Sequence, residues 1–531
     1  MRENPLRRME MACAAALLVA ALAPATAHAA STVVIKTPQG KVRGVRAAGA
    51  DRFLGLPYAK PPIKSLRWKP PLAAGRWRGT RNATRQGPAC IQFQPTGVRE
   101  GQATSEDCLY LDVYRPASAK RRSRLPVIVW IHGGGNTQGT GVIYGGQTMA
   151  RLTKTIVVSI NYRLGAFGWL ALPQLDAETP AGSGNWGQMD QLQALNWVRK
   201  EIRAYGGNPR LVTIAGQSAG AAGVCGLLTA PSAKGYFQRA IIESGPCRST
   251  PPKATTEQTG LNLAHAVGCT DDATVVGCLR DVWGANLHGW VGNLVAAEQQ
   301  YLVTNRTTGT PFMPQNPREA IANGSWNKVP VLVGNVRNEN RLLSLAQWQE
   351  TPDAYTAYVQ KTYGASAADV LARYPLSGYA KPYYALTSVQ TDSGNACQSR
   401  ILADKLGDLT PTYEYEFNDP TSPTLYGFQP PGIDMNSAHS AELAYLFDFT
   451  LGDRPLTSTE TRLATQMKRY WAAFARTGNP NVKGEPSWPR HTAANGQVMT
   501  LRPTGSSSGT GFASEHQCDF WAAHGVAYTG Y

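Results

Sequence analysis

Short apolar segments rich in β-branched residues recur along the chain and are separated by longer amphipathic segments. The amphipathic stretch 188–203 has Met189, Leu192, Leu195 and Trp197 at helical spacing, with charges spread between them. Continuous apolar runs are typical of strands that helices bury on both faces. The alternation predicts an α/β fold with a large, mostly parallel central sheet flanked by helices. The runs are 125–131, 155–160, 211–214, 240–242, 329–333, 413–417 and 498–501.

The start of the mature chain has a different pattern. Residues 32–36 and 41–44 are two β-rich runs joined by Pro38-Gln39-Gly40, which predicts a small N-terminal hairpin. There are no internal repeats, and the Ser/Gly stretch 504–510 is too short to divide domains. We therefore expect one large domain over residues 30–531.

The first 29 residues have the pattern of a secretory signal peptide. Arg2, Arg7 and Arg8 form a basic start, residues 12–23 are apolar, and Ala27-His28-Ala29 is a cleavage site. The apolar run is too short to span a bilayer, although an uncleaved anchor is the alternative. We expect cleavage near Ala29, export to the periplasm or the extracellular space, and no stable membrane anchor.

Charge and composition narrow the range of partners. The chain of 531 residues is 42% hydrophobic and carries a formal net charge of +16. Its basic residues are scattered, and no aromatic residues alternate with them as in a nucleic-acid platform, so we expect no nucleic-acid partner. A basic field steers anionic substrates towards a protein, which is one hypothesis for this charge.

The cysteine pattern indicates disulfides and disfavours a metal site. Nine cysteines are present, and Cys13 leaves with the signal peptide. The remaining even number suits an exported, disulfide-bonded protein. No C-x-x-C pair or Cys/His cluster has zinc spacing, so we predict no metal. No G-x-x-x-x-G-K-[ST] loop is present, which disfavours nucleotide hydrolysis.

The pentapeptide Gly216-Gln217-Ser218-Ala219-Gly220 is the strongest chemical signal. It lies between a β-rich run, 210–215, and a helical run of small residues, 221–228. Strand, G-x-S-x-G and helix together predict a nucleophile elbow, with Ser218 exposed at a helix N-terminus. The alternative is a tight turn with an exposed serine.

A glycine-rich loop follows the predicted strand 125–131. Its sequence is His132-Gly133-Gly134-Gly135. In an α/β-hydrolase such a loop supplies backbone N–H groups to a tetrahedral oxyanion. A flexible loop is the alternative, but the downstream elbow favours an oxyanion hole.

At this point the chain resembles the type-B carboxylesterase family, which includes the cholinesterases. The resemblance extends from about Val33 to Trp521 and implies an α/β-hydrolase fold. It is carried by several long motifs in the family's order, at residues 53–62, 106–114, 161–165, 184–191, 206–209, 216–221 and 474–481.

The resemblance implies a Ser-Glu-His catalytic triad. Ser218 matches the nucleophile. Glu339 matches the acid after a strand, although Asn340 replaces the glycine that usually follows it. His439 matches the family histidine within Ala438-His-Ser-Ala-Glu-Leu443. Without the resemblance, Glu339 would be taken as a surface acid, and four histidines would compete for the role.

Further roles follow from the same resemblance. The oxyanion donors are the amides of Gly134, Gly135 and Ala219. A second shell comprises Ser244, Glu442 and Gln217. The implied disulfides are Cys90–Cys108, Cys269–Cys278 and Cys397–Cys518. Cys225 and Cys247 are left over, and we expect buried free thiols there, with a fourth bond as the alternative.

Three departures argue against choline esters as substrates. Gln217 replaces the glutamate that cholinesterases place before the serine. The segment between Cys90 and Cys108 contains no tryptophan for a choline cation, and Asn136 stands where the family usually has an aromatic residue.

The sequence therefore predicts a secreted serine carboxylesterase, a carboxylic ester hydrolase that works through an acyl-enzyme without a cofactor. Its partner is a small-molecule ester, and the positive charge leads to the hypothesis of polycarboxylate esters such as toxin side-chain esters. The alternatives are a non-catalytic scaffold of the same family, or an amidase or lactonase on the same fold. The oligomeric state is left open.

Overall fold

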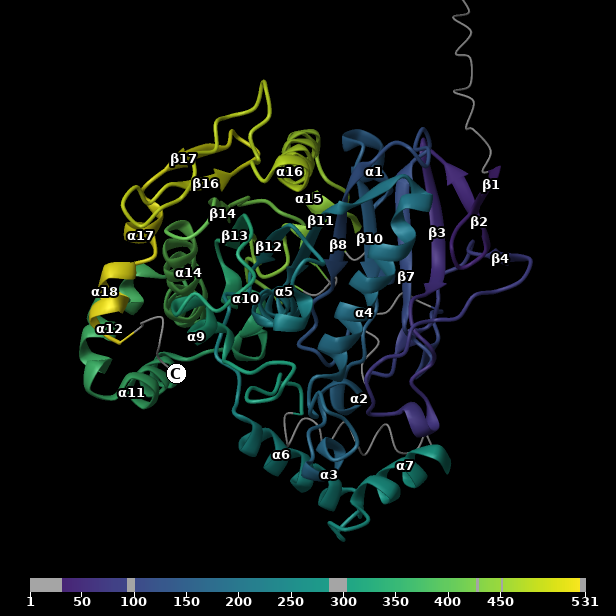
Figure 1. Ribbon diagram of the computed structural model, residues 1–531. Helices are drawn as coiled ribbons and strands as arrows, with labels where there is room; N and C mark the ends of the chain where they lie inside the picture. The colour runs from purple at the N-terminus through teal and green to yellow at the C-terminus, as the bar shows by residue number, and fades with distance from the viewer. Residues whose placement is uncertain (1–30, 93–100, 286–302, 426–428, 450–451, 526–531) are drawn as a thin grey trace, which may run out of the picture.

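The computed structural model describes residues 31–92, 101–285, 303–425, 429–449 and 452–525. The predicted signal peptide, residues 1–29, lies outside this part of the chain. Figure 1 shows one broad, twisted sheet that runs across the molecule from the N-terminal hairpin to the C-terminal strands, with helices on both faces.

The large sheet has 13 strands, and its centre is parallel. The strand order is β1-β2-β3-β7-β10-β8-β11-β12-β13-β14-β16-β17, with β4 paired to β2. The parallel strands are β10 (Ile156–Ile160), β8 (Leu125–Ile131), β11 (Gly207–Gln217), β12 (Arg239–Glu243), β13 (Val331–Val336), β14 (Thr412–Phe417) and β16 (Val498–Leu501). The remaining strands are β1 (Ser31–Lys36), β2 (Lys41–Ala47), β3 (Ala50–Pro57), β4 (Thr80–Asn82), β7 (Tyr110–Pro116) and β17 (Ser507–Gly509).

The predicted α/β-hydrolase fold and the N-terminal hairpin are confirmed, but four strands of the large sheet, β3, β4, β7 and β17, were not predicted. In β7, Asp112 accepts a hydrogen bond from the amide of Gly55, and Arg115 is paired with Asp51. These charged side chains are buried with their partners. They interrupt the continuous apolar pattern from which the central strands were predicted. For that reason the sequence did not predict β3 and β7.

Two helical layers cover the sheet. The helices α2 (Gly165–Trp169), α4 (Trp186–Glu201), α5 (Ala219–Thr229) and α14 (Cys397–Gly407) pack over one face in the larger apolar core. The helices α1 (Gln147–Thr153), α15 (Leu443–Leu446) and α16 (Ser458–Thr477) cover the other face. Both faces of the central strands are thus buried, as continuous apolar runs require.

The other elements surround this sandwich. Small pairs are formed by β5 (Ala89–Cys90) with β6 (Thr104–Ser105), and by β9 (Tyr144–Gly145) with β15 (Asp448–Phe449). The remaining α-helices are α3 (Pro173–Asp176), α6 (Lys253–Ala266), α7 (Val275–Ala285), α9 (Pro317–Ala322), α10 (Glu339–Leu343), α11 (Pro352–Tyr363), α12 (Ala367–Arg373), α13 (Pro382–Thr391), α17 (Phe512–Glu515) and α18 (Cys518–Ala523). Within the described ranges, no helix has both the length and the apolar character needed to cross a membrane.

The structure contains four disulfides. Three are the expected pairs Cys90–Cys108, Cys269–Cys278 and Cys397–Cys518. The fourth is Cys225–Cys247, so the expectation of two free thiols is wrong. Cys225 lies in α5 and Cys247 follows β12, and the side-by-side packing of these two elements brings the cysteines together.

Candidate active site

Ser218 lies at the sharp turn between β11 and α5, at the carboxyl edge of the parallel sheet. Its backbone has φ 57° and ψ −124°, a strained conformation for a residue with a side chain. Its amide donates a hydrogen bond of 2.9 Å to the carbonyl of Glu243, at the end of the neighbouring strand β12. Because the turn is held in this way, the serine side chain remains partly exposed.

The two glycines of the pentapeptide are required by close packing. A Cβ on Gly220 would lie 2.0 Å from the carbonyl oxygen of Ile131, and a Cβ on Gly216 would lie 2.5 Å from the carbonyl carbon of Gly220. Neither glycine has a positive φ. The G-x-S-x-G pattern therefore brings the start of α5 against the end of β8, where the glycine-rich loop begins.

The glycine-rich loop lies directly against the elbow. A Cβ on Gly133 would be 3.0 Å from the Cβ of Ser218. Gly134 has φ 104°, which a residue with a side chain rarely adopts. The side chain of Gln92 supports the far end of the loop by exchanging two hydrogen bonds with Gly139, at 2.8 and 3.0 Å. The loop is thus held beside the serine.

Asn136, which stands in place of the family's usual aromatic residue, has a structural role. Its side-chain nitrogen donates a 2.8 Å hydrogen bond to the carbonyl of Thr304. The contact ties the glycine-rich loop to the segment around Thr304, which the sequence did not connect to the site.

Glu339 and His439 lie together on two neighbouring loops. Glu339 begins α10 after β13, is fully buried, and accepts a 3.0 Å hydrogen bond from the amide of Val336. Nδ1 of His439 is hydrogen-bonded to the other carboxylate oxygen of Glu339. A backbone bridge between Asn338 and Ala438 joins the two loops beside this contact. The residues that the sequence predicted as acid and base are therefore in direct contact.

The substitution at Asn340 is accommodated without strain. Asn340 lies within α10 and does not have a positive φ, so the site does not demand the glycine of the family pattern. Its amide donates to Oγ1 of Thr391, and its side-chain oxygen accepts from Asn395.

The second ring nitrogen of His439, Nε2, is not hydrogen-bonded to Ser218. Nε2 lies 3.1 Å from the side-chain nitrogen of Gln217. Among the described residues, no hydrogen bond is formed by the hydroxyl of Ser218. Catalytic hydrogen bonds are often loose in a free enzyme and tighten when substrate binds, so the arrangement fits a resting site.

Two further carboxyl groups lie behind the pair. Oγ of Ser244 donates to Glu442 at 3.5 Å, so two of the residues that the resemblance assigned to a second shell are in contact. Burial raises the pKa of Glu442 well above its usual range, and the nearby Glu243 and Glu339 raise it further. Burial also raises the pKa of Glu243 to about 8, although Trp471 donates a 2.8 Å hydrogen bond to it. Both groups therefore favour the neutral acid form at neutral pH.

Glu243 was not identified from the sequence. It directly precedes Ser244, and its position at the end of a buried strand was the only available signal.

The other candidate histidines are engaged elsewhere. His491 contacts Asp404 and Glu414, and its pKa is raised to about 9 because these contacts outweigh the effect of burial. His516 is likewise held between two acids. His524 is hydrogen-bonded to the carbonyl of Phe520 and to Asp369. Of the four histidines that follow Glu339, His439 alone contacts that acid.

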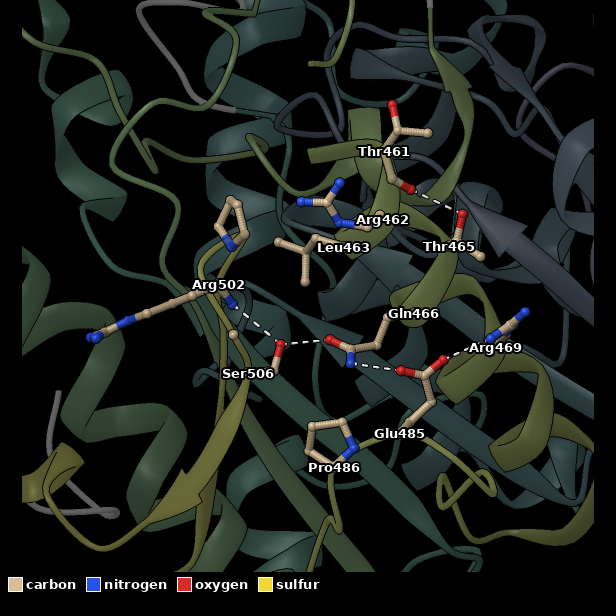
Figure 2. Close-up of a pocket in the computed structure, with 12 residues that line it drawn as sticks. Thr461, Arg462, Leu463, Thr465, Gln466, Arg469, Glu485, Pro486, Arg502 and Ser506 are labelled. Carbon is tan, nitrogen blue, oxygen red and sulfur yellow. Dashed lines mark hydrogen bonds and ion pairs between the residues drawn. The ribbon is translucent and has the colours of Figure 1, made fainter. Parts of the chain in front are cut away.

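The surface cavity drawn in Figure 2 lies away from these residues. It has a volume of about 430 Å³ and is lined by α16 and by the segments around Glu485 and Arg502. Its polar groups bond mainly to one another: Glu485 accepts from Gln466 and Arg469, and Ser506 donates to Gln466. None of its lining residues belongs to the predicted site. Among the described residues, no group of three or more His, Cys, Asp or Glu side chains is placed to hold a metal ion.

The chain matches known esterases over almost its whole length. Residues 31–521 match the carboxylesterase family. Carboxylesterase 1C of Rattus norvegicus is 33% identical, with 92% of this chain and 93% of that protein covered. Fumonisin B1 esterase of Sphingopyxis macrogoltabida is 32% identical, with 92% and 89% covered. Among solved structures, a PNB esterase has a TM-score of 0.77 and 29% identity, with 92% of this chain and 99% of that chain covered.

These matches agree with the fold and with the motifs that carried the resemblance, and the relatives are named as esterases or carboxylesterases. The chain belongs to the carboxylesterase family and is a carboxylic ester hydrolase.

Proposed function

We propose that the protein is an exported serine carboxylesterase in which Ser218 is the nucleophile, His439 the general base and Glu339 the residue that orients the imidazole. The contact between Glu339 and Nδ1 of His439, formed beside the Ser218 elbow, is the main support. A histidine oriented by a buried carboxylate next to a partly exposed serine is the arrangement that activates a hydroxyl nucleophile.

The proposed reaction has two acyl-transfer steps. Nε2 of His439 takes the proton of Ser218 as Oγ attacks the ester carbonyl, and the carbonyl electron pair moves to oxygen. The intermediate collapses, the ester C–O bond breaks, and His439 returns the proton to the leaving alcohol. Water then attacks the acyl-enzyme with the same proton transfers and releases the acid and the free serine. Glu339 stabilises the imidazolium at each stage.

The oxyanion would be held by the amides of Gly134, Gly135 and Ala219. The close approach of Gly133 to the Cβ of Ser218 supports this assignment, because it sets the loop beside the nucleophile. Ala219 is the first residue of α5, where the helix dipole also favours negative charge. Preorganised donors of this kind lower the barrier to acyl transfer.

We further propose that esters with free carboxylates are preferred substrates. The net charge of +16 supports this through attraction of anions. Gln217, which stands beside the catalytic pair, is neutral and does not repel a carboxylate as a glutamate would. Since one relative is named fumonisin B1 esterase, fumonisin B1 is the first natural ester to test. Export is supported by the four disulfides, which suit an oxidising compartment.

Two esters of matched length test the substrate proposal. The mono-p-nitrophenyl ester of glutaric acid carries a free carboxylate, and p-nitrophenyl valerate does not. The proposal predicts a higher kcat/KM for the carboxylated ester at low salt and a smaller difference at high salt, because ions screen the attraction. A higher kcat/KM for the neutral ester at both salt concentrations would contradict the proposal. The Ser218→Ala variant serves as the blank.

A further inference from the structure

Arg306 is a buried arginine next to the nucleophile elbow. Only 4% of its surface is exposed. Its Nη2 donates a 3.1 Å hydrogen bond to the carbonyl of Ala219, the residue directly after Ser218. Its Nε donates a 2.6 Å hydrogen bond to the side-chain oxygen of Gln188 in α4, and its guanidinium carbon lies 5.0 Å from the ring centre of Trp169.

This guanidinium has no acidic partner among the described residues. Three other buried arginines are each paired with a buried carboxylate: Arg67 with Glu106, Arg115 with Asp51, and Arg163 with Asp190. Within the described ranges, Arg306 contacts only neutral acceptors and an aromatic ring. Burial lowers its pKa to about 10, so it remains charged at neutral pH. An uncompensated buried charge is costly, and such a feature suggests a functional role.

The position of Arg306 is fixed by its own segment. The carbonyl of Thr304 accepts from Asn136 of the glycine-rich loop. Thr307 exchanges two backbone hydrogen bonds with the side chain of Asn185, at 2.8 and 3.1 Å. The segment that carries Arg306 is therefore tied to the glycine-rich loop through Thr304 and to the start of α4 through Thr307. Because this segment is held in place, the charge does not need to reorganise during the reaction.

We propose that Arg306 is a positioning residue of the oxyanion site. By binding the carbonyl of Ala219 it holds the first turn of α5, and its uncompensated positive charge stabilises the oxyanion that develops beside the Ala219 amide. The inference rests on the proposed function. It predicts that the positive charge, and not only the hydrogen bonds, contributes to the rate.

Two substitutions separate charge from structure. Arg306→Gln removes the charge and retains a polar side chain, whereas Arg306→Lys retains the charge. Gln188→Glu leaves Arg306 in place and supplies the missing counterion at the atom that now accepts from Nε. The side chain of Gln191, whose nitrogen has no hydrogen bond among the described residues, can turn to donate to the new carboxylate. The carbonyl of Gly223 loses the 2.9 Å hydrogen bond that the side-chain nitrogen of Gln188 donates to it, and the unfolding temperature of Gln188→Glu measures that structural cost. Arg462→Gln, on the exposed surface of α16 (Figure 2), is the matched control for net charge.

The readouts are kcat/KM and KM for p-nitrophenyl valerate, the inhibition constant of a trifluoromethyl ketone that adds to the serine as an oxyanion, and the unfolding temperature. We expect Arg306→Gln and Gln188→Glu to lower kcat/KM about tenfold and to raise the inhibition constant of the ketone about tenfold. Both effects are smaller than the ~10²–10³ loss of rate that removal of a direct oxyanion donor causes. KM should change little, Arg306→Lys should stay within about threefold of wild type, and Arg462→Gln should match wild type.

A purely structural role predicts a different result. Gln188→Glu would then keep the ketone affinity and kcat/KM of wild type, because Arg306 and its contacts remain, and this result would overturn the inference. It decides the question even if Arg306→Gln does not fold. Ser218→Ala, measured in parallel, tests the proposed function separately: activity in that variant refutes the serine mechanism, whereas its loss together with unchanged Gln188→Glu kinetics refutes only the role of Arg306.

Discussion

The side-chain nitrogen of Gln217 lies 3.1 Å from Nε2 of His439, the ring nitrogen that must accept the serine proton in the proposed reaction. The other ring nitrogen is engaged by Glu339, so the amide N–H of Gln217 is directed at the lone pair of a neutral imidazole. The contact holds the resting ring, and it must be released or turned when His439 becomes charged.

Gln217→Glu should therefore shift the pH dependence of activity. A carboxylate at this position stabilises the charged imidazolium, which cannot accept a proton from Ser218. We expect the midpoint of the acid limb of the kcat/KM profile to move upward by about one pH unit. Gln217→Met, which is neutral and of similar length, should leave the midpoint near that of wild type. An unchanged midpoint in Gln217→Glu would show that residue 217 does not act on the imidazole.

Glu339→Gln should leave the fold intact and remove most of the activity. The amide retains the shape of the side chain but no longer stabilises the imidazolium through Nδ1 of His439. The loss in kcat should approach the ~10⁴-fold seen when the acid of a serine triad is replaced by its amide. Glu515→Gln, at an exposed ion pair with Arg337, is the control and should keep full activity. Retention of more than a tenth of the rate in Glu339→Gln would argue for a different acid.

Gly134→Ala tests the oxyanion loop. A Cβ at this position would lie 2.2 Å from the carbonyl oxygen of Gln138, and the φ of 104° disfavours any side chain. The loop must shift, and a lost oxyanion donor typically costs ~10²–10³ in kcat. Gly75→Ala is the matched control, since a Cβ there meets nothing within 4 Å. Equal activity in the two variants would place the oxyanion donors elsewhere.

The unexpected Cys225–Cys247 bond should contribute to stability. Its sequence separation of 22 residues corresponds to roughly 3 kcal/mol in the loop-entropy account. Replacing both cysteines by alanine should lower the free energy of unfolding by about that amount in urea titrations, with a smaller effect for Cys269–Cys278 and its separation of nine residues. Peptide mapping without reductant provides the direct check, and alkylated Cys225 in the native protein would contradict the bond.

His516 should make stability depend on alkaline pH. Burial lowers its pKa, but hydrogen bonds to Asp392 and Glu416 outweigh burial and raise it from 6.5 to about 9. Arg337 and Glu515 complete this charged cluster. Because the folded-state pKa is raised, the stabilisation is fully present below pH 6.5 and is lost as pH rises through about 9.

The predicted size of this effect is about 3 kcal/mol in the free energy of unfolding. His516→Gln should be less stable than wild type at pH 6, and the difference should shrink towards pH 10. A difference that stays constant over this range would mean that the charge of His516 does not contribute.

The sequence predicted the parts of the fold that rest on local patterns. Continuous apolar runs located the central strands, and G-x-S-x-G between a strand and a helix located the elbow. The strand β7 was missed because Asp112 and Arg115 are buried with partners that are distant in sequence.

Long-range contacts account for the other gaps. Arg306 lies 87 residues from Ala219 along the chain, and Glu243 lies 228 residues from Trp471. No local pattern marks either pair. The Cys225–Cys247 bond also depends on how α5 and β12 pack, which the spacing of the cysteines does not reveal.

The central claim is that Ser218 is the nucleophile of an esterase, and covalent labelling tests it most directly. Wild type and Ser218→Ala are treated with an organophosphate, assayed on p-nitrophenyl valerate, and mapped by peptide mass spectrometry. We predict that wild type loses activity in proportion to a single adduct on Ser218, and that the variant is neither labelled nor active. Ester hydrolysis by Ser218→Ala, or inactivation of wild type through an adduct on another residue, would contradict the mechanism.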